Sequence, residues 1–211
     1  AATNYYLMRQ NQDDASSPAP VPSARRSGRS IGVPGVMRML DMAQKEHGRL
    51  AWSQLFDYGI KLSTDGFQIP GRLGAAIASN ANNLALDANA MATYFHSDGT
   101  PRKTGETMTN LPYARTLRAL ASQGADAMHT GDIAKAILAK AAQSVGDDAA
   151  KTPITPSLMT LSDLANYKAK KREAVCTNYR GTYHVCTMSP PSSGGIAIAQ
   201  SLGILSQFNL A

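Results

Sequence analysis

The stretch with the most specific spacing for chemistry is Ser189-Pro-Pro-Ser-Ser-Gly-Gly195. Its two prolines restrict the backbone after a predicted strand, and its two glycines allow close approach before a predicted helix. The first-turn N–H groups of that helix would face the turn, where backbone donors can bind an anion or an oxyanion. A tight corner that only packs the helix against a sheet would use the same residues, so both roles stay open. The residues to which we assign this near-site backbone role are Ser192, Ser193, Gly194 and Gly195.

The two cysteines, Cys176 and Cys186, lie on either side of a predicted hairpin turn at Arg180-Gly181. Neighbours across two antiparallel strands come within disulfide range, so a Cys176–Cys186 bond and two buried free thiols are both open. A register slip of one residue would put the two side chains on opposite faces. His184 is close in sequence, but Cys176, His184 and Cys186 lack a fourth ligand at sensible spacing. We therefore expect no bound metal.

Acid–base chemistry would fall to one of four histidines, His47, His96, His129 or His184. His47 is expected in the last turn of a helix, where a cation complements the helix dipole. His96 falls in a polar loop, and His129 lies just before a predicted helix start. Neither a G-x-S-x-G nor an S-x-x-K sequence is present beside them. Structural or surface roles are therefore favoured for all four.

Short helices separated by clear breaks must position these residues. Apolar residues at helical spacing, together with Pro and Gly, predict helices at about 34–48, 55–65, 73–84, 110–124 and 133–141. Thr160 and Asp163 form a capping-box pattern that begins a further short helix. Residues of about 173–188 predict a β-hairpin, and Ile196 to Leu205 predict a buried helix. Residues 1–28 are expected to be extended or linker-like, and 29–211 to form the helix-rich remainder.

Composition excludes several classes of protein. The 211 residues carry a net charge of +6, but only 17% are charged and 6% are aromatic. The basic clusters at 25–29 and 168–172 are not interleaved with aromatic side chains, so we expect no nucleic-acid partner. No stretch approaches the roughly 20 apolar residues of a membrane span, so none is expected. Two cysteines cannot form a disulfide framework.

Several motifs, in order along the chain, resemble the γ-glutamyltransferase family. They run from about Arg29 to the C-terminus, and Met188-Ser-Pro-Pro-Ser-Ser-Gly-Gly195 is the closest match among them. The others are Arg29-Ser-Ile-Gly-Val-Pro-Gly35, Trp52-Ser-Gln-Leu-Phe56, Asp65-Gly66-Phe67, Gly124-Ala-Asp-Ala-Met128, Thr130-Gly-Asp-Ile-Ala134, Leu161-Ser-Asp-Leu-Ala-Asn-Tyr167 and Tyr179-Arg-Gly181.

The resemblance implies an α+β fold of the N-terminal-nucleophile hydrolase type, an αββα sandwich. This chain would be part of the large chain, mostly helical with a hairpin near its C-terminus. In that family a precursor cuts itself into a large and a small chain. The small chain's N-terminal Thr, with its α-amine as base, takes the γ-glutamyl group of glutathione or a related amide and passes it to water, an amino acid or a peptide. The family uses no cofactor, so we expect none, and its bacterial members are typically periplasmic or secreted.

None of the family's catalytic residues can be placed on this sequence. The nucleophile, the acids that hold the substrate amine and the oxyanion-hole glycines belong to the small chain, and the large chain's Asp-Gly-Arg-Glu-Thr-Ala-Pro type motif finds no match. Ala1 has no hydroxyl, and Thr3 is not terminal. We therefore expect a small chain from the same precursor as partner, a γ-glutamyl substrate, and no activity from this chain alone. The alternatives are a cephalosporin acylase, a poly-γ-glutamate hydrolase, or a non-catalytic scaffold derived from the fold.

Overall fold

The computed structural model describes residues 28–209, so the predicted linker-like segment lies outside the described residues except for Gly28. That glycine is buried and begins a short 3-10 helix, η3 (Gly28–Ser30). Two compact units follow from the packing, with the division between Ala169 and Lys170. The sequence predicted one helix-rich portion from 29 to 211. The structure divides the hairpin and the last helix from the rest of that portion, and residues 167–174 at the division form neither helix nor strand.

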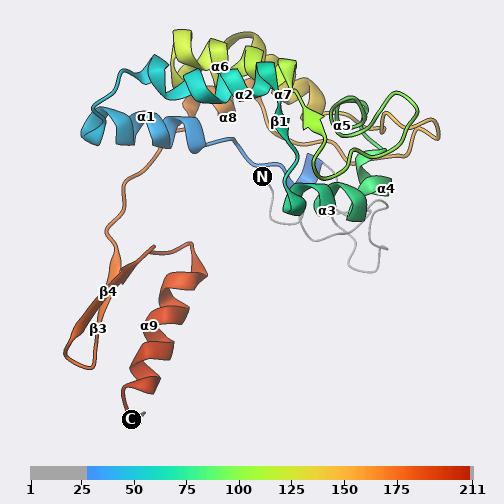
Figure 1. The fold of residues 1–211 in the computed structure, drawn as a ribbon. Coiled ribbons are helices and arrows are strands. Elements are labelled where there is room, and N and C mark those ends of the chain that lie inside the picture. The colour runs from blue at the N-terminus through green and yellow to red at the C-terminus, as the bar shows by residue number, and fades with distance from the viewer. Residues whose placement is uncertain (1–27, 210–211) are drawn as a thin grey trace, which may run out of the picture. The chain divides into compact units, whose positions relative to one another are not determined.

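Helices make up most of the first unit (Figure 1). Its α-helices are α1 (Val36–His47), α2 (Asp57–Asp65), α3 (Gly71–Ser79), α4 (Ala81–Leu84), α5 (Ala88–Tyr94), α6 (Leu111–Gln123), α7 (Gly131–Ala141) and α8 (Leu161–Asn166). Two further 3-10 helices are η4 (Trp52–Phe56) and η5 (Ala125–Met128). Two short antiparallel strands, β1 (Phe67–Gln68) and β2 (Thr107–Met108), pair with each other. No helix of the described residues is long and apolar enough to cross a membrane.

Local end signals account for the helices that the sequence predicted correctly. Asn110 caps α6, since its Oδ1 accepts the Tyr113 N–H at 3.0 Å, and Gly124 ends the helix at a φ of 81°. In α8 the Thr160 hydroxyl accepts the Asp163 N–H at 3.2 Å while the Asp163 carboxylate accepts the Thr160 N–H at 2.8 Å. The predicted capping box is confirmed.

Two details of the helix prediction are wrong. The helix expected over 73–84 breaks at Asn80, whose side-chain amide donates to the Ala76 carbonyl at 2.9 Å and ends α3 there. The second is α5, which begins after Asp87 and was not predicted. The Asp87 carboxylate accepts the Ala90 N–H at 2.8 Å, a capping bond that stabilises a helix of only seven residues.

Two apolar clusters hold the first unit together. In one, Phe56 of η4 packs with Leu117 and Leu120 of α6, and the indole N–H of Trp52 donates to the Leu120 carbonyl at 2.8 Å. In the other, Ile69 packs with Ile77 of α3 and Met108 of β2. The two clusters therefore join elements that are distant in sequence, η4 to α6 and α3 to β2.

The second unit is a hairpin with one helix against it (Figure 1). Strands β3 (Val175–Tyr179) and β4 (Tyr183–Thr187) are antiparallel, and α9 (Ser193–Leu205) packs against both. The predicted hairpin is confirmed, with Arg180 and Gly181 in the left-handed region at its turn. The prediction that α9 is buried is wrong for the described residues. Ile196, Ile198 and Ile204 are 42%, 46% and 62% exposed, because the hairpin covers only one side of the helix.

Candidate functional site

The corner between β4 and α9 contains the residues that the sequence singled out. The strand ends at Thr187, the Pro190–Pro191 peptide is cis, and α9 begins at Ser193. Ser192 is the N-cap residue with an extended backbone, but its side chain makes no capping hydrogen bond. The first-turn N–H groups of a helix have no partner within the helix, and here the N-cap side chain does not supply one. They are therefore available as backbone donors for an anion or an oxyanion.

The two glycines of the corner differ in their surroundings. Gly195 is buried, and a Cβ there would overlap the Met188 carbonyl oxygen and lie 3.0 Å from Thr187 Cγ2. Gly194 is exposed, with no atom within 4 Å of where its Cβ would be. Gly195 thus allows the backbone of α9 to approach the end of β4, which is the corner role. Ser192, Ser193 and Gly194 are exposed and lie at the open side of the same corner.

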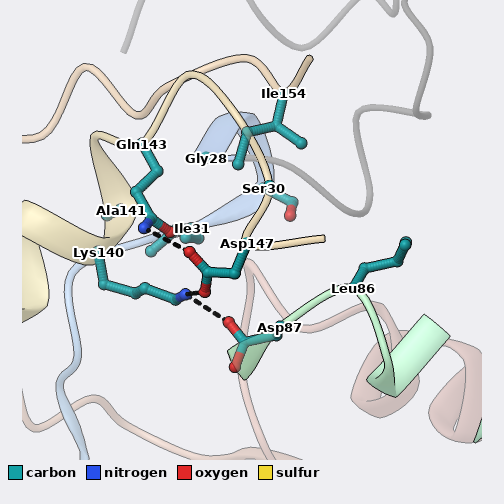
Figure 2. Close-up of a pocket in the computed structure, with 11 residues that line it drawn as sticks. Gly28, Ser30, Ile31, Leu86, Asp87, Lys140, Ala141, Gln143, Asp147 and Ile154 are labelled. Carbon is teal, nitrogen blue, oxygen red and sulfur yellow. Dashed lines mark hydrogen bonds and ion pairs between the residues drawn. The ribbon is translucent and has the colours of Figure 1, made fainter. Parts of the chain in front are cut away.

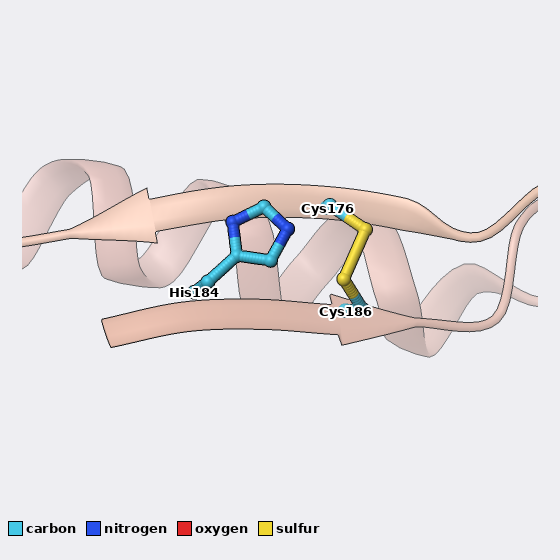
Figure 3. A group of neighbouring side chains, drawn as sticks. All are labelled: Cys176, His184 and Cys186. Carbon is cyan, nitrogen blue, oxygen red and sulfur yellow. A yellow bond between two sulfur atoms is a disulfide. The ribbon is translucent and has the colours of Figure 1, made fainter.

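The exposed face of the hairpin holds the second group of predicted residues. Cys176 lies directly opposite Cys186 with their Cα atoms 4.1 Å apart, and the two sulfurs form a disulfide. Both cysteines and His184 are exposed, and the ligand atoms of these three residues lie within 4.8 Å of one another (Figure 3). The structure thus has a disulfide at the surface of this unit, where buried free thiols were the alternative.

A pocket in the first unit contains charged residues that sequence reasoning missed. It measures about 310 Å³, and Lys140 at the end of α7 pairs in it with Asp87 at 2.5 Å and Asp147 at 2.7 Å (Figure 2). Gln143 Nε2 also donates to Asp147 at 3.2 Å. Asp87 and Lys140 are 53 positions apart, and no local pattern joins them. Of the two ion pairs, only that of Lys140 with Asp147 joins residues close enough in sequence, seven positions apart, to be suspected from the sequence.

Each ion in this pocket is paired within the protein. Burial of the Asp87 carboxylate opposes its ionisation, but hydrogen bonds from Lys140 and the Ala90 N–H outweigh this and lower its pKa. The hydrogen bond from Lys140, with that from the Ala88 N–H, lowers the pKa of Asp147. Burial likewise opposes the charge of Lys140. The two carboxylates that pair with Lys140 outweigh this effect of burial, so the pKa of Lys140 is raised. The cluster therefore ties the start of α5 and the loop after α7 together.

The histidines take structural or surface positions. His129 is 1% exposed, its Nδ1 lies 3.0 Å from the Leu164 carbonyl oxygen, and its ring stacks on Tyr167 at 5.9 Å between centroids. Because a carbonyl only accepts, Nδ1 carries the hydrogen. His96 Nε2 lies 2.9 Å from the Glu106 carboxylate, and His47 ends α1. Among the described residues, the hydrogen bonds of His96 and His129 go to a carboxylate and a backbone carbonyl rather than to a hydroxyl nucleophile.

The comparisons with known proteins define the class of this fold first. The crystal structure of Helicobacter pylori gamma-glutamyltranspeptidase matches with a TM-score of 0.82 and 27% identity, covering 94% of this chain and 53% of that one. The Bacillus anthracis transpeptidase enzyme CapD matches with a TM-score of 0.69 and 27% identity, covering 84% and 56%. The fold is that of an N-terminal-nucleophile hydrolase of this type, as the sequence predicted.

Sequence comparison then defines the family. The profile of the family described as Gamma-glutamyltranspeptidase matches residues 1–211, and the chain belongs to this family. The glutathione hydrolase proenzyme of Bacillus subtilis (strain 168) is 33% identical over 199 residues, covering 94% of this chain and 32% of its own length. The acylase ACY 1 proenzyme of Pseudomonas sp. (strain SE83) is 30% identical over 182 residues, covering 86% and 30%. The chain thus spans about a third of the length of these relatives.

Proposed function

We propose that this chain is the large-chain part of an enzyme that moves the γ-glutamyl group of glutathione or a related amide to water, an amino acid or a peptide. The observation that carries the proposal is the family match over all 211 residues, together with a relative that is a glutathione hydrolase proenzyme. In the proposed reaction the N-terminal Thr of a separate small chain attacks the amide carbonyl. Its own α-amine accepts the hydroxyl proton and passes it to the nitrogen of the leaving group. The amide C–N bond then breaks, the leaving group departs as a neutral amine, and a γ-glutamyl ester of the Thr hydroxyl remains.

The corner at the start of α9 is the part of this chain that we place near the reaction. Its open side presents Ser192, Ser193 and Gly194 with the first-turn N–H groups of a 13-residue helix. Such donors favour a carboxylate or a developing oxyanion, since the helix N-terminus is its positive end. We assign no catalytic residue to the described part of this chain. The nucleophile and the substrate-binding acids are proposed to lie on the small chain.

The proposal includes a partner and a location. The partner is the small chain cut from the same precursor, which is supported by relatives that are described as proenzymes. The location is the periplasm or outside the cell. An exposed Cys176–Cys186 disulfide supports it, because disulfides persist in oxidising compartments and are rare in a reduced cytosol.

A second function has a specific observation in its favour. The acylase ACY 1 proenzyme covers 86% of this chain at 30% identity, close to the values for the glutathione hydrolases. The same fold and the same N-terminal nucleophile would then cleave a different amide, such as the side chain of a cephalosporin. Substrate choice would depend on side chains beyond those described.

One experiment separates the proposals. The full-length product of the reading frame is expressed, and its intact mass and N-terminal sequences show whether it cuts itself before a Thr. Release from a chromogenic γ-glutamyl amide is then compared with release from an acylase substrate, and the matched control carries Ala in place of the new N-terminal Thr. Self-cleavage with γ-glutamyl release, lost in the control, is expected. Cleavage with acylase activity alone would favour the second function, and no cleavage with no release would favour a non-catalytic scaffold.

A further inference from the structure

The face of the hairpin opposite α9 gathers side chains that bind soft metal ions. Residues at alternate positions of a strand share a face, and the half-buried ones, including Val175, Thr177 and Val185, lie toward the helix. The other face carries the cross-strand pairs Cys176–Cys186 and Asn178–His184. All four of these side chains are exposed. Two sulfurs, one imidazole and one amide therefore lie next to one another on the exposed face of the hairpin.

The imidazole of His184 is oriented by its neighbour. Its Nδ1 lies 2.7 Å from Asn178 Oδ1, and since an amide oxygen only accepts, Nδ1 carries the hydrogen. The lone pair is then on Nε2. Figure 3 shows the ring between the two strands with one ring nitrogen facing the disulfide. A hydrogen bond that holds the second nitrogen of a ligating histidine in this way is typical of metal sites, where it sets the tautomer and the ring angle.

We propose that this face is a redox-gated site for Zn²⁺, closed while the disulfide is formed and open after its reduction. Two equivalents of a small thiol reduce the bond: the first thiolate attacks one sulfur and releases the other, and the second thiol resolves the mixed disulfide. The products are two cysteine thiols and one oxidised small-molecule disulfide. Zn²⁺ then binds Cys176 Sγ, Cys186 Sγ and His184 Nε2, and the two thiol protons pass to solvent.

The geometry fits a three-ligand site with an open position. Zinc–sulfur and zinc–nitrogen bonds of about 2.3 and 2.0 Å place tetrahedral ligand atoms roughly 3.5–3.8 Å apart. The three ligand atoms already lie within 4.8 Å of one another, so side-chain rotation after reduction suffices and the strands need not move. Three protein ligands are too few for a closed structural site but are the number found in open zinc sites, with water as the fourth. Two thiolates also balance the charge of the ion.

Cobalt is the probe for the test, because Co²⁺ bound to thiolates absorbs by charge transfer and Zn²⁺ displaces it. The full-length protein is reduced, freed of reductant without oxygen, and titrated with Co²⁺ and then with Zn²⁺. We expect a thiolate charge-transfer band at one Co²⁺ per chain that Zn²⁺ removes. The same preparation with the disulfide intact should show no band, and this control needs no substitution.

Variants then define the ligands. Cys186→Ser should abolish the band, and His184→Ala should weaken metal binding more than tenfold. Asn178→Ala should weaken it by about tenfold, the usual effect of removing the hydrogen bond to a ligating histidine. The matched control is His47→Ala, an exposed histidine at the end of α1, which should bind as the unaltered protein does. Absence of the band after reduction, or equal affinity in His184→Ala, would overturn the proposal whatever the enzymatic activity proves to be.

Discussion

Substitution of Gly195 tests whether the corner between β4 and α9 depends on close approach of the two backbones. A Cβ at Gly195 would overlap the Met188 carbonyl oxygen, whereas one at Gly194 would meet nothing within 4 Å. Both positions lie in the first turn of α9, and neither has a positive φ. The pair Gly195→Ala and Gly194→Ala therefore adds the same methyl group to the same helix, once against backbone and once into open space.

The expected difference in the free energy of unfolding is about 2 kcal/mol. Glycine to alanine within a helix gains roughly 0.5–1 kcal/mol, and both variants receive that gain. An inserted methyl group that forces a packed backbone to move costs about 1–3 kcal/mol, and only Gly195→Ala bears that cost. Gly194→Ala should therefore be as stable as the unaltered protein or slightly more stable, and Gly195→Ala should be less stable by about 1–2 kcal/mol.

Urea unfolding of the full-length protein, followed by circular dichroism, measures the two variants side by side. Under the proposed function, a shift of the corner of about 1 Å near the reacting amide also lowers the rate of γ-glutamyl release, by up to about 100-fold. Equal midpoints for the two variants, or a Gly195→Ala protein as stable as the unaltered one, would refute the argument from close approach.

Substitutions at three further positions test other parts of the structure. Thr160→Ala should cost about 1 kcal/mol of stability through the lost cap of α8, and Thr160→Ser should cost little, as urea midpoints would show. Leu120→Ala should lower the free energy of unfolding by about 3 kcal/mol, because the Leu120 side chain is 2% exposed. The comparison is Leu120→Met, which conserves volume and should cost less than about 1.5 kcal/mol. Similar losses in the two variants would contradict the packing described. Lowered carboxylate pKa values at Asp87 and Asp147 contribute stability above pH 4 that is lost as pH falls through the folded pKa values. The melting temperature of Lys140→Met should therefore fall less between pH 7 and pH 3 than that of the unaltered protein, and an equal fall would count against the paired cluster.

Signals that act over a few residues were sufficient for much of the secondary structure. The cap at Asn110, the capping box at Thr160 and the turn at Arg180-Gly181 each act within four positions, and all three appear in the structure. Asp87 also caps a helix, but the short, weakly periodic sequence after it did not show one. Asn80 looked like a helix residue by spacing, and its competing side-chain hydrogen bond was not visible in the apolar pattern.

The order of strand, turn and helix around the candidate site was predictable from the sequence, but the surroundings of its residues were not. The sequence placed a strand, a turn and a helix around Ser192, Ser193, Gly194 and Gly195, and the structure has them in that order. It could not distinguish the two glycines, because only the fold brings the Met188 carbonyl oxygen against Gly195. Apolar spacing in α9 predicted burial, but exposure depends on what covers the helix rather than on its own residues.

Residue types and local spacing thus determined the capped ends of α6 and α8, the hairpin and the family resemblance. The tertiary structure alone decided the pairing of Lys140 with Asp87 and the contact between His129 and the Leu164 carbonyl oxygen. It also decided which face of the hairpin α9 covers, and that His184 lies beside the disulfide on the other face. Contacts of this kind join residues that are distant in sequence or depend on strand register, and they form only when the chain closes on itself.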